Sequence, residues 1–202
     1  MTTTVETVVI ESATADDRTE AFFRALGLQE RVRVRPGAPG SGFRGLTVSL
    51  VLDQPSSVDA TVAAALAAGG TEVKPVSRSL WGYGGTVAAP DGTVVTVASA
   101  QKKDTGPATS EIQQLVVQLA VDDVATSTAF YAERGVGTGR RFGRRYAELD
   151  TAPVAVTLNR RAALAKAAGV PAEGDGAPGV VLQAGTDPFT DPDGVVWEPV
   201  TR

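Results

Sequence analysis

Residues 192–199 read Pro-Asp-Gly-Val-Val-Trp-Glu-Pro, and residues 90–97 read Pro-Asp-Gly-Thr-Val-Val-Thr-Val. In both stretches Asp and Gly supply the side-chain hydrogen bond and the permissive backbone of a tight turn. The apolar, β-branched run that follows is typical of a strand. Each stretch is therefore predicted to be a closing hairpin, and its recurrence near the end of each half indicates that the chain repeats itself.

The repeat extends to the beginning of each half. The matching pairs, which share one offset along the chain, are Val8-Val9 with Val116-Val117, Phe22-Phe23 with Phe130-Tyr131, and Gly27 with Gly135. Between the copies, residues 101–110 are polar, contain Gly and Pro and show no apolar period, which is typical of a linker. We therefore predict a first half at 1–100, a linker at 101–110 and a second half at 111–202.

Strands alternate with helices in each half. Apolar stripes at helical spacing predict helices at 16–26, 58–68, 124–134 and 161–168. Apolar or alternating runs predict strands at 6–11, 30–35, 46–52, 71–76, 85–88, 93–98, 113–121, 144–149, 153–158, 179–184 and 195–200. This order predicts an α+β protein of two similar halves, each a curved sheet with helices on its outer face, cupping a shared or paired cavity.

Composition excludes several function classes. The 202 residues contain no cysteine and no histidine, which excludes disulfides, thiolate nucleophiles, Ser-His-Asp catalysis and metal sites built on imidazole or thiolate. The net charge is −4, and the basic run at 140–145 is better explained as a solvated edge strand than as a nucleic-acid site. We see no signal peptide and no membrane-spanning run, so we expect a cytoplasmic protein with no nucleic-acid or membrane partner. Arginine greatly outnumbers lysine, which suggests a GC-rich, bacterial genome.

The order of motifs resembles that of a known group. An N-terminal strand, a helix carrying Phe22-Phe23 or Phe130-Tyr131 shortly before a Gly, and a closing hairpin that ends in Trp197-Glu198 are similar to the vicinal oxygen chelate superfamily. That group includes glyoxalases, bleomycin-resistance proteins and extradiol dioxygenases. The resemblance covers both halves and implies βαβββ-type units repeated into cupped mixed sheets.

The resemblance also implies a metal site, from which this chain departs. Enzymes of the group hold a divalent metal with two histidines and a glutamate, the glutamate coming from the strand after the PDG turn. Of the corresponding positions, Glu6 or Thr7, Gln114, Thr96 and Glu198, only Glu198 is an ordinary ligand. We therefore expect no metal and no cofactor. An all-oxygen Mg²⁺ or Mn²⁺ site would have to use Glu198, Gln114 and Glu148.

Several side chains are candidates for binding a ligand. Glycine-rich loops around Trp81 and Tyr83, and around Phe43 and Arg44, present rings and a guanidinium either to a cavity or to the core. Gln114 and Gln118 lie an even number of positions apart, so both point to one face of their strand. The predicted ligand-binding residues are Phe43, Arg44, Trp81, Tyr83, Gln114, Gln118, Trp197 and Glu198.

These observations lead to three hypotheses of function. The first is metal-independent binding of a small organic molecule between the sheets, such as sequestration of an antibiotic or metabolite, by a pseudo-twofold monomer or a homodimer. The second is a metal-independent cyclase, isomerase or lyase of secondary metabolism, with acid–base groups drawn from Glu198, Glu148, Tyr146 and Tyr83. The third is a non-catalytic interaction protein whose cavity is filled by its own side chains.

Overall fold

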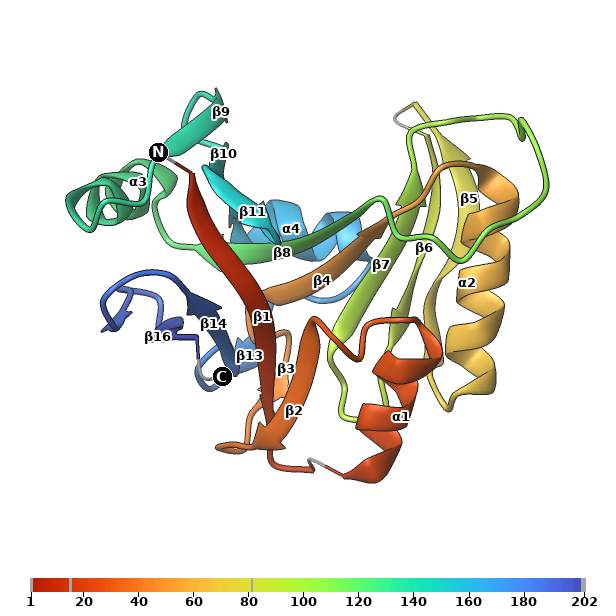
Figure 1. Cartoon of the computed structure of the whole chain (residues 1–202), viewed down its shortest axis with the longest axis horizontal. Coiled ribbons are helices and arrows are strands. Elements are labelled where there is room, and N and C mark those ends of the chain that lie inside the picture. Colours follow the sequence, from red (N-terminus) through yellow and green to blue (C-terminus); the bar gives the residue numbers. More distant parts are fainter. Residues whose placement is uncertain (1, 15, 81, 201–202) are drawn as a thin grey trace.

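The computed structural model describes residues 2–14, 16–80 and 82–200. These residues form four helices, two large sheets and one two-stranded sheet (Figure 1). The helices are α1 (Asp17–Ala25), α2 (Pro55–Ala67), α3 (Val124–Glu133) and α4 (Arg161–Ala168). The strands are β1 (Thr3–Ser12), β2 (Val32–Pro36), β3 (Ser41–Gly42), β4 (Leu46–Val51), β5 (Thr71–Ser79), β6 (Gly82–Ala88), β7 (Val94–Ser99), β8 (Gln114–Val121), β9 (Thr138–Phe142), β10 (Tyr146–Leu149), β11 (Thr151–Pro153), β12 (Ala155–Arg160), β13 (Gly174–Asp175), β14 (Val180–Ala184), β15 (Phe189–Thr190) and β16 (Val196–Pro199).

The eight-stranded sheet consists of two complete βαβββ units. Its strand order is β5-β6-β7-β4-β8-β12-β10-β9. In the unit β4-α2-β5-β6-β7 the first strand is parallel to the last, and the same holds for β8 and β12 in the unit that contains α3. The units join where β4 and β8 pair antiparallel, with Thr47 opposite Gln118. This arrangement gives the sheet an approximate twofold symmetry.

The six-stranded sheet consists of two shortened units. β1 is parallel to β2, with α1 between them, and β14 is parallel to β16. β1 and β14 pair antiparallel, as β4 and β8 do in the other sheet. Each large sheet thus takes strands from both sides of residues 101–110, so the two sequence repeats share both sheets. The predicted α+β fold of βαβββ-type units with cupped mixed sheets is confirmed.

The glycines of the two hairpin turns have the same φ angle. Gly92 and Gly194 both have φ of +89°, a region that glycine enters without strain. In the first turn the Asp91 carboxylate accepts hydrogen bonds from the backbone N–H and the hydroxyl of Thr93. In the second turn the equivalent residue, Asp193, accepts instead from the backbone N–H of Asp122 and the hydroxyl of Ser127, and Asp191, which precedes the motif, accepts from the backbone N–H of Val195 at 2.7 Å. The glycine of the motif therefore has the same role in both copies, whereas its Asp binds locally in the first copy and binds residues distant in the chain in the second.

The main core lies between the sheets and three of the helices. It contains alternate residues of β1, β4, β7, β8 and β12 together with apolar residues of α1, α2 and α3. Helix α4 packs on the opposite face of the eight-stranded sheet, where Leu164, Ala165 and Ala168 form a second, smaller core with Val94 and Ala120. In Figure 1, α2 lies outside β5 and β6. None of the helices in the described residues is long and apolar enough to cross a membrane.

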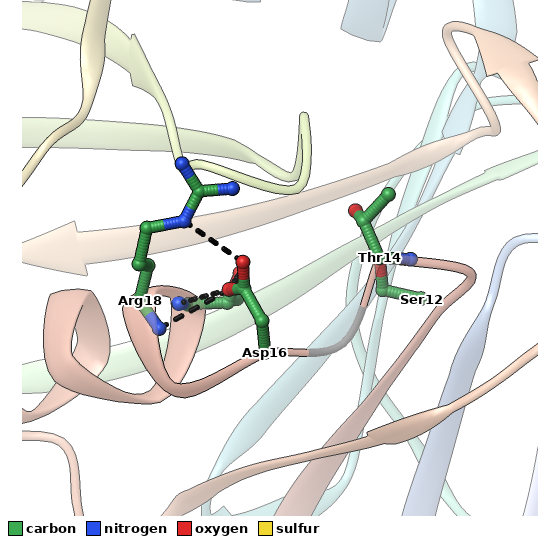
Figure 2. Close-up of polar contacts among 5 residues, drawn as sticks. Ser12, Thr14, Asp16 and Arg18 are labelled. Atoms are coloured by element: carbon green, nitrogen blue, oxygen red, sulfur yellow. Dashed lines mark hydrogen bonds and ion pairs between the residues drawn. The ribbon is translucent and has the colours of Figure 1, made fainter.

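The first helix begins at a strong N-cap. The Asp16 carboxylate accepts hydrogen bonds from the backbone N–H groups of Arg18 and Thr19, and the Arg18 side chain closes over it at 2.8 Å (Figure 2). The bonds from Arg18 and from the Thr19 backbone hold the pKa of Asp16 below its ordinary value. An Asp in this position satisfies amide groups that a helix otherwise leaves unpaired. The predicted helix start at residue 16 corresponds to this cap.

The segment predicted to be a linker is held against α2. Gln54 precedes the helix, is 1% exposed, and its amide nitrogen donates to the carbonyls of Gly106 and Pro107 at 2.9 and 2.7 Å. Its amide oxygen accepts from the backbone N–H of Thr105 at 2.7 Å. A single buried amide thus satisfies several backbone groups of the connecting segment, which gives that segment a defined course.

Candidate functional site

The polar side chains of the eight-stranded sheet gather on one face. This inner face is the one that carries α4, opposite the face covered by α2 and α3. The register aligns Thr47, Gln118, Thr157 and Glu148 in one row across β4, β8, β12 and β10. Within the row the Thr47 hydroxyl donates to the Gln118 side-chain oxygen at 2.8 Å. Side chains from both sequence repeats are therefore adjacent here.

A pocket of about 460 Å³ lies over the β8–β12–β10 part of this face. We call it the Tyr146 pocket; its lining includes Gln114, Gly139, Arg140, Tyr146, Glu148 and Thr157. The Tyr146 hydroxyl donates to Glu148 at 2.9 Å. Burial and this hydrogen bond raise the pKa of Tyr146 above its ordinary value. Tyr146 is thus a proton donor near neutral pH, and Glu148 accepts its bond.

A second pocket, of about 490 Å³, lies over β4, β6 and β7. Ser49, Thr96 and Gln118 line it, and α4 forms one wall through Leu164 and Ala168. It adjoins the Tyr146 pocket, because Gln118 is the register partner of Thr157 on the neighbouring strand. The predicted pair Gln114 and Gln118 thus lies on one face, with one residue in each pocket.

Glu198 lies elsewhere, in an ion cluster on the six-stranded sheet. Arg35 on β2 contacts Glu11 on β1 at 2.9 Å and Glu198 on β16 at 3.0 Å. Its second guanidinium nitrogen adds a bond to Glu198 at 3.3 Å. These contacts with Glu198 and Glu11, against the cost of partial burial, raise the pKa of Arg35. Glu198 is therefore a paired carboxylate.

The residues present do not fit the metal site of the resembled enzymes. Glu198 lies on the six-stranded sheet, whereas Gln114 and Glu148 lie on the eight-stranded one, so the all-oxygen set is not brought together. In the described ranges no three His, Cys, Asp or Glu side chains gather closely enough to hold an ion. Between Glu11 and Glu198, the place of a cation is taken by the Arg35 guanidinium.

Three of the predicted ligand-binding residues are Trp197, Tyr83 and Trp81, and their side chains are not shown to face a ligand. Trp197 is fully buried: its ring stacks on Phe189 at 5.3 Å and its N–H donates to Tyr131, so it belongs to the core. Burial raises the pKa of Tyr131 well above its ordinary value. The Tyr83 hydroxyl donates to Asp59 on α2, although the residue also contributes to the lining of the second pocket. Trp81 lies outside the described residues.

Phe43 and Arg44 line a third pocket, of about 250 Å³. Phe43 is 3% exposed and packs into the small core beneath α4, which leaves it little surface for a ligand. Arg44 donates to the backbone carbonyl of Ala177 at 2.7 Å and to that of Glu11 at 3.3 Å. Its guanidinium thus links β1 to the segment that contains Ala177, beside the pocket that Arg44 lines.

Two residues of the site were not among the sequence candidates. Arg140 lines the Tyr146 pocket but was interpreted only as part of a basic run. Thr157 is 4% exposed and lies on the pocket floor. The alternation of residues along the predicted strands 144–149 and 153–158 was the available signal, since it places Tyr146, Glu148 and Thr157 on the face opposite the core.

The arrangement of units defines a glyoxalase-like fold. No protein-family model and no curated protein matches the chain. Among solved structures, glyoxalase I from Zea mays is similar with a TM-score of 0.62 at 16% identity, over 96% of this chain and 91% of that one. A putative dioxygenase from Bacillus subtilis is similar with a TM-score of 0.57 at 11% identity, over 97% and 84%. At such identities the likeness shows the fold, and the function has to be argued from the site.

Proposed function

We propose that this protein binds a small organic molecule in the Tyr146 pocket without a metal ion. The observation that carries the proposal is that Gln114 on β8 and the pair Tyr146 and Glu148 on β10 line one pocket of about 460 Å³. That volume lies within the range of about 300–1,000 Å³ that is usual for small-molecule sites. Sequestration of an antibiotic or metabolite, as in the bleomycin-resistance proteins, is the form of this function that needs no metal chemistry.

The pocket walls supply both specificity and contact area. The Gln114 amide, the Glu148 carboxylate and the Thr157 hydroxyl offer directed hydrogen bonds, and the Tyr146 ring offers an apolar surface. A few convergent polar groups on a mostly preformed surface are what orients a bound small molecule. The pocket volumes also argue against a cavity filled by the protein's own side chains, as the interaction-protein hypothesis requires.

One contact favours a second candidate function, a metal-independent cyclase, isomerase or lyase. Tyr146 and Glu148 are hydrogen-bonded at 2.9 Å and both face the pocket. Tyr146 keeps its proton at neutral pH, so it would act as the acid and Glu148 as the base. Among the earlier candidates, Glu198 is paired with Arg35 and Tyr83 faces α2, so neither belongs to this pair.

A thermal-shift screen of small metabolites and antibiotics against the purified chain tests binding. Gly139→Phe is the matched control, because a side chain there meets only Glu148, at ordinary contact distance, and extends over the pocket. We expect compounds that stabilise the native chain and fail to stabilise the Gly139→Phe variant. Compounds that stabilise both equally would place the site elsewhere.

Two further measurements separate the alternatives. Native mass spectrometry with added Mn²⁺, Zn²⁺ and Ni²⁺ should give the mass of the bare chain; a stoichiometric metal adduct would contradict metal independence. Mass analysis of a bound compound after incubation distinguishes binding from catalysis. If the compound is converted, and if Tyr146→Phe binds it but no longer converts it, the enzyme hypothesis replaces sequestration.

A further inference from the structure

The Tyr146 pocket contains two opposite charges that the protein does not pair. Glu148 accepts a hydrogen bond from Tyr146, and Arg140 lines the same pocket. Within the part of the chain that the structure describes, neither side chain takes part in an ion pair. Both charges act on the same hydroxyl, since Glu148 raises the pKa of Tyr146 and Arg140 lowers it.

An open pair of this kind has a chemical meaning. A guanidinium and a carboxylate at the surface gain little from contact with each other, and these two remain farther apart than ion-pair distance on one pocket wall, so both stay available to a ligand. A ligand that carries both a carboxylate and an ammonium group would satisfy the two side chains at once. A ligand with a single charge would satisfy one of them and leave the other open, so it would gain less.

Aromatic side chains lie directly beside these charges. Phe142 on β9 is the register partner of Tyr146 on β10, and their ring centroids are 5.8 Å apart. The Phe142 side chain is 61% exposed, which is unusual for a ring of that size. The two rings offer an apolar platform next to the charged groups, and such a platform suits an aromatic or long aliphatic side chain.

We propose that the ligand of the Tyr146 pocket is a zwitterion of the amino-acid type with an apolar side chain. Arg140 binds its carboxylate, Glu148 binds its ammonium group, and the rings of Tyr146 and Phe142 contact its side chain. This inference rests on the proposed function, because it names the class of molecule that the same pocket takes.

Four matched probes test the charge requirement by calorimetry at pH 7.5. L-Phenylalanine carries both charges, 2-phenylethylamine only the ammonium, 3-phenylpropanoate only the carboxylate, and 3-phenylpropanamide neither. We expect L-phenylalanine to bind about tenfold more tightly than either singly charged probe, since each added charge-assisted contact is worth roughly that factor. The neutral amide should bind most weakly.

Two variants assign each charge to its side chain. Arg140→Gln should remove the advantage of 3-phenylpropanoate over the amide, and Glu148→Gln should remove that of 2-phenylethylamine. The controls are Arg141→Gln, since Arg141 is the register partner of core residue Ala147 on the other face, and Glu72→Gln on the distant strand β5. Both controls should leave all four affinities unchanged, and unchanged melting temperatures should show that every variant folds.

The outcomes separate this inference from the proposed function. If L-phenylalanine binds no better than the amide, or if Arg140→Gln and Glu148→Gln change nothing, the zwitterion is wrong. If the metabolite screen then yields neutral compounds that Gly139→Phe excludes, pocket binding still stands. If neither the probes nor the screen yield a compound that depends on this pocket, both proposals fail.

Discussion

Two carboxylates that the sequence makes look alike have opposite surroundings in this molecule. Glu198 on the six-stranded sheet is held by Arg35, which also holds Glu11. Glu148 on the eight-stranded sheet accepts a hydrogen bond from Tyr146 and faces a pocket of about 460 Å³. The two sheets follow the same plan, in which antiparallel units meet at their first strands. In the six-stranded sheet Arg35 pairs with both Glu11 and Glu198. In the eight-stranded sheet Glu148 has no ion-pair partner among the described residues.

The difference indicates how the two sheets divide their tasks. A guanidinium between two carboxylates satisfies all three groups and leaves nothing for a ligand to gain. A carboxylate with one neutral partner still has acceptor capacity, and that capacity is directed into a pocket. The contrast gives the Arg35 cluster a structural role and supports the binding role that we propose for the Tyr146 pocket.

Blocking the open pocket should have the largest effect. Gly139→Phe places a ring over Glu148 without backbone strain, because its Cβ would meet only Glu148 atoms, at 3.8 Å or more. We expect at least about a hundredfold loss of affinity for any ligand of the pocket, because a filled site loses most of its contact area. Calorimetric titration measures this, and retention of native affinity would remove the pocket from the proposal.

Replacing Arg35 should lower the free energy of unfolding more than replacing Arg140. Arg35→Ala leaves Glu11 and Glu198 facing each other without a cation, and we expect a loss of about 1–2 kcal/mol after allowance for their partial exposure. Arg140→Ala removes a side chain with no ion pair among the described residues, so we expect a change within about 0.5 kcal/mol. Urea unfolding of both variants checks this; equal losses would contradict the division of tasks.

Neutralising Glu148 should lower ligand affinity, whereas neutralising Glu198 should lower only stability. Glu198→Gln removes one charged partner of Arg35 and should cost about 0.5–1 kcal/mol of stability, while leaving ligand affinity intact. Glu148→Gln should reduce affinity about tenfold, the usual factor for one charge-assisted contact. Denaturant curves and titrations on the same two variants test the pair. An affinity loss in Glu198→Gln would place that residue in the binding site after all.

The smallest effect is expected in the alkaline titration of the three tyrosines. The pKa values of Tyr83, Tyr131 and Tyr146 all lie above the ordinary value near 10. The unfolded chain therefore loses these protons first, so this contribution to stability is complete below pH 10 and falls as the pH rises through the folded-state pKa values. Absorbance at alkaline pH should show delayed ionisation, with Tyr146 ionising earlier in Glu148→Gln. Three ordinary pKa values would refute the expectation.

The sequence predicted individual helices, strands and turns better than the contacts that they make with one another. The two PDG turns, the helix that begins after Asp16 and the strand at 113–121 follow from turn chemistry, capping and apolar period, and each has a counterpart in the structure. Strand β9 (Thr138–Phe142) was missed, because its polar and arginine residues show no apolar alternation. Trp197 was predicted to bind a ligand because the local sequence around it is the same whether its ring faces a pocket or the core.

What the sequence alone determined about this protein is its repeat, its α+β class and the absence of imidazole and thiolate chemistry, because these depend on residue type and short-range order. Tertiary structure alone decided which carboxylate is paired and which is open. Arg35 and Glu198 lie 163 positions apart in the chain, yet their side chains are 3.0 Å apart. Only the pairing of strands across the two sheets brings such distant side chains together, and no local pattern records that pairing.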